Sequence, residues 1–270
     1  MASLDGLWRT RVLLPVASTL LAVAALACGG GGGQPSGAPA GTLPSPEGEA
    51  GVPPEIEEEL RNLFKLWGTR DARIVYKVQT VSGGVREEAD LLFQWRPSLK
   101  QWRMDISLAG GESGSIIDDG QGLYLCDDAE HVCLKFAPEE SPVAPLPFVD
   151  DSQMLADPLQ VVEAVLEQLR GGRTQVSSRT IANLAARCFT STGMASLGGL
   201  LEKLEVCFAV DSALLLRAEA LARPSGGGQD SSLFEATQVS GDVAADAFTP
   251  PYEVIDTTAP EEQTTPGSGS

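Results

Sequence analysis

Hydrophobic and polar residues alternate along most of the central part of this chain, and the alternation falls into two blocks. In the first block, residues 72–136, apolar side chains recur at every second position in short runs that end at Gly, Pro, Asp or Ser. A period of two is typical of β-strands with one buried face. The runs predict six strands, at Ala72–Thr80, Ala89–Trp95, Trp102–Leu108, Ser113–Asp118, Gly122–Cys126 and Val132–Phe136.

The second block, residues 174–240, has the same period. It predicts five further strands, at Thr174–Arg179, Leu184–Thr192, Leu204–Val210, Leu214–Arg223 and Leu233–Ser240. Successive strands joined by short turns pair as antiparallel neighbours, and a long sheet of this kind must curl to bury one face. We therefore expect a mainly β (α+β) fold with a curled antiparallel sheet of about eleven strands.

Two segments have a helical period instead. Pro54 opens the first, which carries a stripe of apolar residues and stops at Gly68; the stripe consists of Ile56, Leu60, Leu63, Phe64 and Trp67. Asp157 as N-cap and Pro158 at the first helical position open the second, which continues to Leu169. The chain thus predicts an N-terminal helix and a second helix inserted after the sixth strand, both covering the concave face of the sheet.

The N-terminal stretch has the composition of an export signal. Arg9 and Arg11 precede the uncharged run Val12–Ala27, and small residues then lead to Cys28. The run is shorter than the roughly 20 residues that span a bilayer core, and Pro15 interrupts it. The alternative interpretation is an ordinary secretory signal with an incidental cysteine.

The sequence Ala25-Leu26-Ala27-Cys28 resembles the lipobox of bacterial lipoproteins. The resemblance implies that residues 1–27 are a removed signal peptide. Cys28 would become the mature N-terminus, carrying a diacylglyceryl thioether with acyl chains such as palmitate. The protein would then be extracytoplasmic and lipid-anchored to the bacterial cell membrane, at its periplasmic face or outer leaflet.

Polar segments without periodicity flank the predicted domain. Residues 28–53 are rich in Gly, Pro and Ser, a composition typical of a flexible tether, which at this length reaches on the order of 25–30 Å. Residues 256–270 form a second polar tail. We therefore assign the folded domain to residues 54–255.

The net charge excludes one class of partner. The chain carries a formal charge of −18, and residues 1–27 contribute +1 through Asp5, Arg9 and Arg11, so the mature part is near −19. Such a surface repels phosphate backbones, so nucleic acid is not an expected partner. It also gains nothing from anionic headgroups, so membrane contact is expected to come from the lipid anchor.

The sequence does not determine the oligomeric state, and we expect a monomer rather than an oligomer.

Four cysteines remain beside Cys28, and an even number outside the cytosol indicates disulfides with three possible pairings. Cys126 and Cys133 flank the tip of one predicted hairpin. Cys188 and Cys207 lie on neighbouring predicted strands, and the apolar parity of those strands turns both to the face opposite the core. We therefore predict the bridges 126–133 and 188–207, both on the outer face.

Several short motifs resemble the LolA/LolB/LppX-like lipoproteins. They are Trp95-Arg96-Pro97, Trp102-Arg103-Met104-Asp105, the hairpin Asp119-Gly120-Gln121-Gly122-Leu123-Tyr124, and a closing Phe248-Thr249-Pro250-Pro251. The resemblance covers about 54–255. It implies a half-open β-barrel lined by apolar residues with helices as a lid; several members carry acyl chains of lipoproteins or glycolipids. A related fold occurs in periplasmic regulators of anti-sigma factors.

No constellation of catalytic residues stands out. The lone histidine, His131, lies at a hairpin tip, and Gly111-Glu112-Ser113-Gly114-Ser115 departs from a G-x-S-x-G elbow at its fifth position. The acid pairs Asp118-Asp119, Asp127-Asp128 and Asp150-Asp151 lie in predicted turns and lack the ligand spacing of a calcium loop. We expect a binding protein rather than an enzyme, without metal or cofactor.

Two functions from different classes remain. One is a lipid-anchored carrier or acceptor that holds a lipid or acylated ligand in an apolar cavity. Its candidate ligand contacts are residues of the apolar strand faces, namely Tyr76, Phe93, Trp102, Met104 and Phe208. The other is a surface-anchored interaction or sensor module that binds a protein partner and no lipid, in which the same residues fill the core against the helices.

Overall fold

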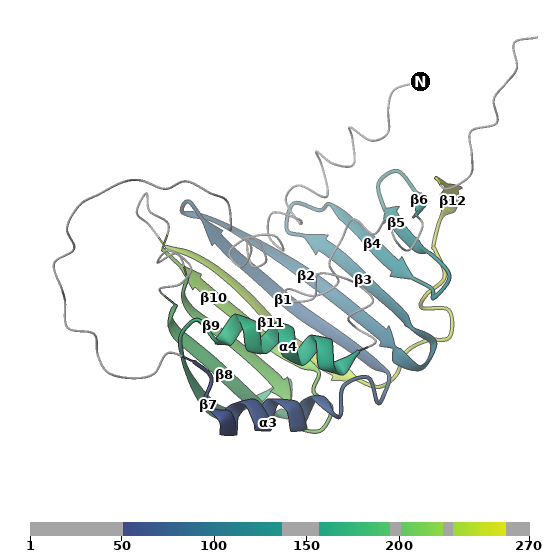
Figure 1. The fold of residues 1–270 in the computed structure, drawn as a ribbon. Helices are drawn as coiled ribbons and strands as arrows, with labels where there is room; N and C mark the ends of the chain where they lie inside the picture. The colour runs from purple at the N-terminus through teal and green to yellow at the C-terminus, as the bar shows by residue number, and fades with distance from the viewer. Residues whose placement is uncertain (1–50, 137–156, 195–200, 224–228, 258–270) are drawn as a thin grey trace, which may run out of the picture.

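The computed structural model describes residues 51–136, 157–194, 201–223 and 229–257, which form one twelve-stranded sheet with two helices on one side (Figure 1). The expected signal peptide, Cys28, the tether up to residue 50, the proline-rich stretch after Phe136 and the tail from residue 258 lie outside the described residues.

The two alternating blocks fold as two antiparallel meanders. The first meander runs β1 (Ala72–Ser82), β2 (Val85–Arg96), β3 (Gln101–Leu108), β4 (Ser113–Asp118), β5 (Leu123–Asp127) and β6 (Val132–Phe136). The second runs β7 (Arg173–Ile181), β8 (Leu184–Met194), β9 (Leu201–Ala209), β10 (Leu215–Ala222) and β11 (Asp230–Ser240). These are the eleven strands expected from the alternation, with ends that differ by a few residues.

The meanders join in the middle of the sheet, where β1 pairs with β11. The spatial order is β12-β6-β5-β4-β3-β2-β1-β11-β10-β9-β8-β7, so the sheet is open, with β12 and β7 at its edges. The result is the mainly β, curled and unclosed sheet that the alternation predicts, consistent with a half-open barrel.

The twelfth strand, β12 (Glu253–Asp256), was not expected from the sequence. It pairs with β6 in parallel, while every other pair of neighbouring strands is antiparallel. All four of its residues are exposed, so no apolar alternation marks it. The pairing depends on the preceding residues 241–252, which bring it to the β6 edge.

The two helices lie side by side over the β7–β11 half of the sheet, whereas β4–β6 extend beyond them (Figure 1). In α3 (Pro54–Phe64), Glu55 and Glu57 lie in the first turn, where carboxylates favour the helix dipole. In α4 (Pro158–Leu169), the side chain of Asp157 caps the helix by accepting from Leu159 N at 2.9 Å. Neither helix is long and apolar enough to cross a membrane, nor is any other helix within the described ranges.

α3 ends at Phe64, one turn before the end of its predicted stripe. The chain continues through hydrogen-bonded turns to Gly68, whose φ of +68° reverses its direction. Trp67 remains buried although it has left the helix, because it packs on Trp95 with ring centroids 4.9 Å apart. The apolar stripe of the sequence thus extends one turn beyond the end of the helix.

Each face of the sheet carries its own apolar cluster. We call the face that α3 and α4 cover the inner face and the opposite one the outer face. The inner face and the helices form the main core. On the outer face, residues 241–252, here called the C-terminal strap, cover a smaller cluster around Ile117, Tyr124, Ala247 and Phe248.

Candidate functional site: the inner face of the sheet

Strand alternation places all five candidate ligand contacts on the inner face. Phe93 on β2 stands directly opposite Met104 on β3, and Trp102 precedes Met104 by two residues on the same strand. Tyr76 lies on β1, next to β2. Phe208 lies on β9, in the half of the sheet that the helices cover. The strands therefore gather four of the five residues on β1–β3 and keep Phe208 apart from them.

Phe208 packs as a core residue beneath α3. Its ring meets Phe64 edge-on at 4.9 Å and lies 6.5 Å from Phe189, and its side chain is fully buried. Edge-to-face aromatic pairs of this kind stabilise a core beyond the area that they bury. The packing of α3 on the sheet therefore explains the burial of Phe208 without a ligand.

Tyr76 ties two strands together across a third. Its hydroxyl donates to Leu215 O at 2.7 Å, linking β1 to the start of β10 over β11. Burial raises the pKa of Tyr76 far above its ordinary value. Because its polar atom is already used within the protein, Tyr76 offers a ligand only its ring.

Trp102 is different, because its polar atom makes no well-formed hydrogen bond to any residue that the structure describes. The side chain is 2% exposed and its Nε1 is buried. A buried donor left unpaired costs about 1–3 kcal/mol, which is why most such groups are satisfied. Among the five candidates, Trp102 is the one that combines an inner-face position with an unused hydrogen-bond donor.

Asp118 stands opposite Trp102 on the neighbouring strand β4, so both side chains lie on the inner face. Its carboxylate accepts from Gly120 N at 2.9 Å. Burial raises the pKa of Asp118, while the Gly120 N–H and the nearby Trp102 indole act in the opposite direction. The indole is thus close enough to influence the carboxyl, although no well-formed hydrogen bond joins Nε1 to it.

Sequence reasoning did not place Asp118 in the site. It treated the Asp118-Asp119 pair as turn residues, which describes Asp119 well, since Asp119 Oδ1 accepts from the backbone N–H of Gln121 and of Gly122. Asp118, however, is the last residue of β4, where the predicted fourth strand also ended. The signal that could have placed Asp118 on the inner face was its position in the strand, because Asp118 is two residues after Ile116 and alternate residues of a strand share a face.

The outer face carries the two disulfides, and the pairs are Cys126–Cys133 and Cys188–Cys207, as expected from the sequence. Both bridges join directly opposed residues of neighbouring strands. They are also fully buried. The first lies in the cluster beneath the C-terminal strap.

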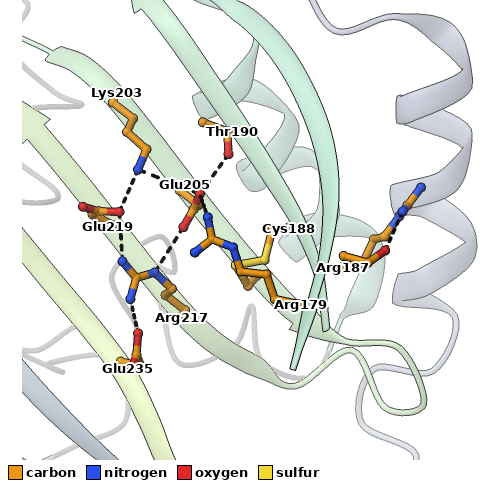
Figure 2. The surroundings of a disulfide bond; sticks show 11 residues. Arg179, Arg187, Cys188, Thr190, Lys203, Glu205, Arg217, Glu219 and Glu235 are labelled. Carbon is orange, nitrogen blue, oxygen red and sulfur yellow. Dashed lines mark hydrogen bonds and ion pairs between the residues drawn. A yellow bond between two sulfur atoms is a disulfide. The ribbon is translucent and has the colours of Figure 1, made fainter. Parts of the chain in front are cut away.

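A network of ion pairs surrounds the second bridge (Figure 2). Its centre is Glu205, whose side chain is 3% exposed and which binds Arg217 at 3.1 Å and Arg179 at 2.9 Å. Thr190 donates to Glu205 at 3.1 Å. Arg217 reaches on to Glu219 and Glu235. Acidic and basic groups are matched here, so the network has no unpaired charge to offer a ligand.

The C-terminal strap is held by two arginines of the outer face. Arg96 donates to Val243 O at 3.1 Å and lies over the Phe248 ring at 5.2 Å, and Arg103 donates to Ala247 O at 3.0 Å. These contacts involve the strand residues of the Trp-Arg-Pro and Trp-Arg-Met motifs. In this chain the arginines of both motifs therefore hold the strap rather than line the inner face.

His131 and the acidic pair beside it belong to the β5–β6 hairpin tip. The His131 ring stacks on Tyr252 at 5.0 Å, and the Tyr252 hydroxyl donates to Asp128 at 3.0 Å. Asp127 accepts from the backbone of Ala129 and Glu130. Within the described ranges, no group of three or more His, Cys, Asp or Glu side chains could hold a metal ion.

Comparison with known proteins gives matches by structure alone. No protein-family model and no curated protein matches the sequence. Among solved structures, lipoprotein LppX of Mycobacterium tuberculosis matches with 15% identity and a TM-score of 0.39, over 72% of this chain and 100% of LppX. A LolA superfamily protein of Nitrosomonas europaea matches with 8% identity and a TM-score of 0.31, over 70% and 97%.

The complex of MucA and MucB from Pseudomonas aeruginosa also matches, with 14% identity and a TM-score of 0.41, over 70% of this chain and 58% of the matched chain. The matched structures thus include the LolA and LppX proteins that the sequence resembles. At these identities and TM-scores, the likeness concerns the course of the chain and not the site.

Proposed function

We propose that the protein is an extracytoplasmic lipoprotein, anchored through Cys28, that binds an acyl chain of a lipid or of an acylated ligand on the inner face of its sheet. The role is one of binding or carrying, without chemistry on the ligand. The proposal combines the export and lipobox pattern of residues 9–28 with the character of the inner face.

One observation carries the proposal most directly, namely the continuous apolar inner face that extends from β1 to β5. Its side chains are buried at 6% exposure or less, and they are Ile74, Tyr76, Val78, Leu91, Phe93, Trp95, Trp102, Met104, Ile116, Leu123 and Leu125. The two helices lie over the other half of the sheet (Figure 1). Ligand sites for apolar molecules are lined by such side chains together with a few placed polar groups.

Native mass spectrometry of the protein purified from its membrane tests the proposal. We expect a co-purified lipid, and uptake of a fluorescent acyl probe by the protein after delipidation. Phe93→Asp would place a charge at the centre of the inner face and should abolish probe uptake. Val85→Asp, at an exposed position of β2, is the matched control and should not. Absence of both co-purified lipid and probe uptake in the unmodified protein would refute the proposal.

The alternative function is a surface-anchored module that binds a protein partner without lipid. The acidic net charge of −18 and the length of the tether favour it. Crosslinking in intact cells separates the two functions. A protein partner recovered equally with the unmodified protein and with Phe93→Asp would support the partner-binding module, because that partner would not depend on the inner face.

A further inference from the structure

We propose that Trp102 and Asp118 form a polar subsite on the inner face that binds the hydroxyl-bearing head of an uncharged amphiphile such as a monoacylglycerol. This inference rests on the proposed acyl-binding function and adds the chemistry of the head group to it. The indole Nε1–H donates to a ligand oxygen, and the Asp118 carboxylate accepts from a ligand hydroxyl.

The two side chains meet where the inner face reaches its end. Trp95, Trp102, Asp118 and Leu123 form one row across β2–β5, since each stands directly opposite the next. Trp95, Trp102 and Leu123 are buried, whereas Asp118 is half-buried. A polar pair therefore interrupts an apolar row at the place where the strands turn back through the Asp119–Gly122 hairpin.

The donors and acceptors present select a hydroxyl group. Nε1 of Trp102 can only donate, and among the described residues its buried hydrogen has no well-formed partner beyond the nearby Asp118 carboxyl. Asp118 can accept from a ligand, since Gly120 N uses one position on one carboxylate oxygen. A hydroxyl both accepts from the indole and donates to the carboxylate, so a single diol or glycerol head satisfies both residues.

Charged heads fit less well. A phosphate would face the carboxylate of Asp118. An ammonium could pair with Asp118, but it has no lone pair to accept from the indole. Burial also raises the pKa of Asp118, and a carboxyl in such surroundings is better matched to a neutral, hydrogen-bonding partner than to a second negative charge.

The test uses the full chain with Cys28→Ser, which leaves every residue of the domain in place. Displacement of a bound fluorescent fatty acyl probe is measured with monooleoylglycerol and with methyl oleate, two ligands that share the acyl chain and differ in the hydroxyls. Trp102→Phe removes the N–H and keeps an aromatic ring. Asp118→Asn keeps the shape and an acceptor for Gly120 N while removing the charge.

We expect the unmodified domain to prefer monooleoylglycerol. Trp102→Phe should weaken monooleoylglycerol roughly fivefold, as the loss of one hydrogen bond implies, and should leave methyl oleate within about twofold. Asp118→Asn should reduce the same preference by about twofold to fivefold. The matched control is Trp95→Phe in the same row, because Trp95 Nε1 is not among the buried donors without a partner. It should not change the preference.

The outcomes separate the subsite from the function that it serves. If probe and both oleoyl ligands bind but Trp102→Phe and Asp118→Asn keep the preference, the subsite is wrong and acyl binding stands. If the unmodified domain binds the two ligands equally, the subsite is likewise overturned. If no acyl probe binds to a protein whose circular dichroism shows a folded sheet, the proposed function fails and the subsite with it.

Discussion

At the scale of single residues, Glu205 is the most deeply buried charged residue within the described ranges, with 2% of the whole residue exposed. Burial of a carboxylate is unfavourable unless cations and hydrogen bonds compensate it, and here Arg179, Arg217, Lys203 and Thr190 do so. The arrangement holds β7, β8, β9 and β10 in register around the Cys188–Cys207 bridge (Figure 2).

Glu205→Gln tests this role. Removal of the charge leaves three cations around a neutral amide, so we expect the free energy of unfolding to fall by about 2 kcal/mol. This is less than the cost of breaking a fully buried pair, because the cations reach solvent. Glu202→Gln on the same strand is the control. Its ion pair with Arg223 is exposed, so the change should stay below about 0.5 kcal/mol in urea denaturation. Equal effects of the two substitutions would contradict the role of Glu205.

At position 120, the backbone conformation and a close neighbouring atom both require glycine. Its φ is +83°, and a Cβ there would lie 2.9 Å from Leu99 O, a backbone atom of the adjacent β2–β3 connection. The Asp119–Gly122 hairpin can therefore pack closely against the β2–β3 connection only because residue 120 has no side chain. This explains the glycine at that position of the Asp-Gly motif.

Gly120→Ala should therefore destabilise the protein more than the backbone conformation alone requires. Gly84→Ala is the control, because Gly84 has a φ of +81° but nothing within 4 Å of its Cβ position. We expect Gly84→Ala to cost about 1 kcal/mol, and Gly120→Ala at least about 1 kcal/mol more, by thermal or urea unfolding. A smaller cost for Gly120→Ala than for Gly84→Ala would show that the contact with Leu99 is not maintained.

At the scale of elements, β12 changes the character of one edge of the sheet. Without it, β6 would present a row of unpaired backbone groups, and exposed strand edges tend to pair with other chains. β12 covers these groups in parallel, and Thr257 N continues the contact by donating to Lys135 O at 3.1 Å. The Arg96 and Arg103 contacts to the strap position β12 although its own side chains are exposed.

Truncation of the Cys28→Ser chain after Tyr252 should therefore promote self-association. The truncated chain keeps the strap but leaves the β6 edge open, and light scattering with size-exclusion chromatography should detect dimers or larger species. The matched control ends after Thr257, keeps β12 and should remain a monomer. If both chains are monomeric at the same concentration, β12 does not protect the edge.

At the scale of the whole molecule, the two ends of the domain lie at opposite edges of the sheet. Gly51 forms a bridge with Arg173 at the start of β7, and the chain leaves the described domain after β12. The predicted tether from Cys28 would therefore join the domain at the β7 edge, outside the strands and helices that form the main core. Loss of a lipid at Cys28 should not disturb that core.

Cys28→Ser tests the predicted anchor. We expect a folded protein that is released from the membrane or retained with an uncleaved signal, since stable anchoring needs more than one acyl chain and Cys28 would supply them. Fractionation after a high-salt wash is the measurement, and thiol titration should still find both disulfides formed. Normal cleavage combined with retention on washed membranes would show that membrane contact comes from the domain itself.

The sequence by itself determined the eleven strands of the two meanders, the two helices and the order of these elements. Alternation such as that of Ile74, Tyr76 and Val78 is a local consequence of burying one face of a strand, so it marks the strands, the two meanders and the faces on which the cysteines lie. The helix with Asp157 as its cap is determined locally as well, because a cap needs only the first turn that follows it.

Only the tertiary structure decided the rest. β12 has no apolar period to reveal it, since it exists through pairing with a strand more than a hundred residues earlier in the chain. Alternation identifies a buried face but not what each side chain contacts there, so it could not distinguish Phe208 beneath α3 from Trp102 with its unpaired donor. Asp118 joins Trp102 only because the register of β3 and β4 sets them opposite each other, and register is a property of two strands together.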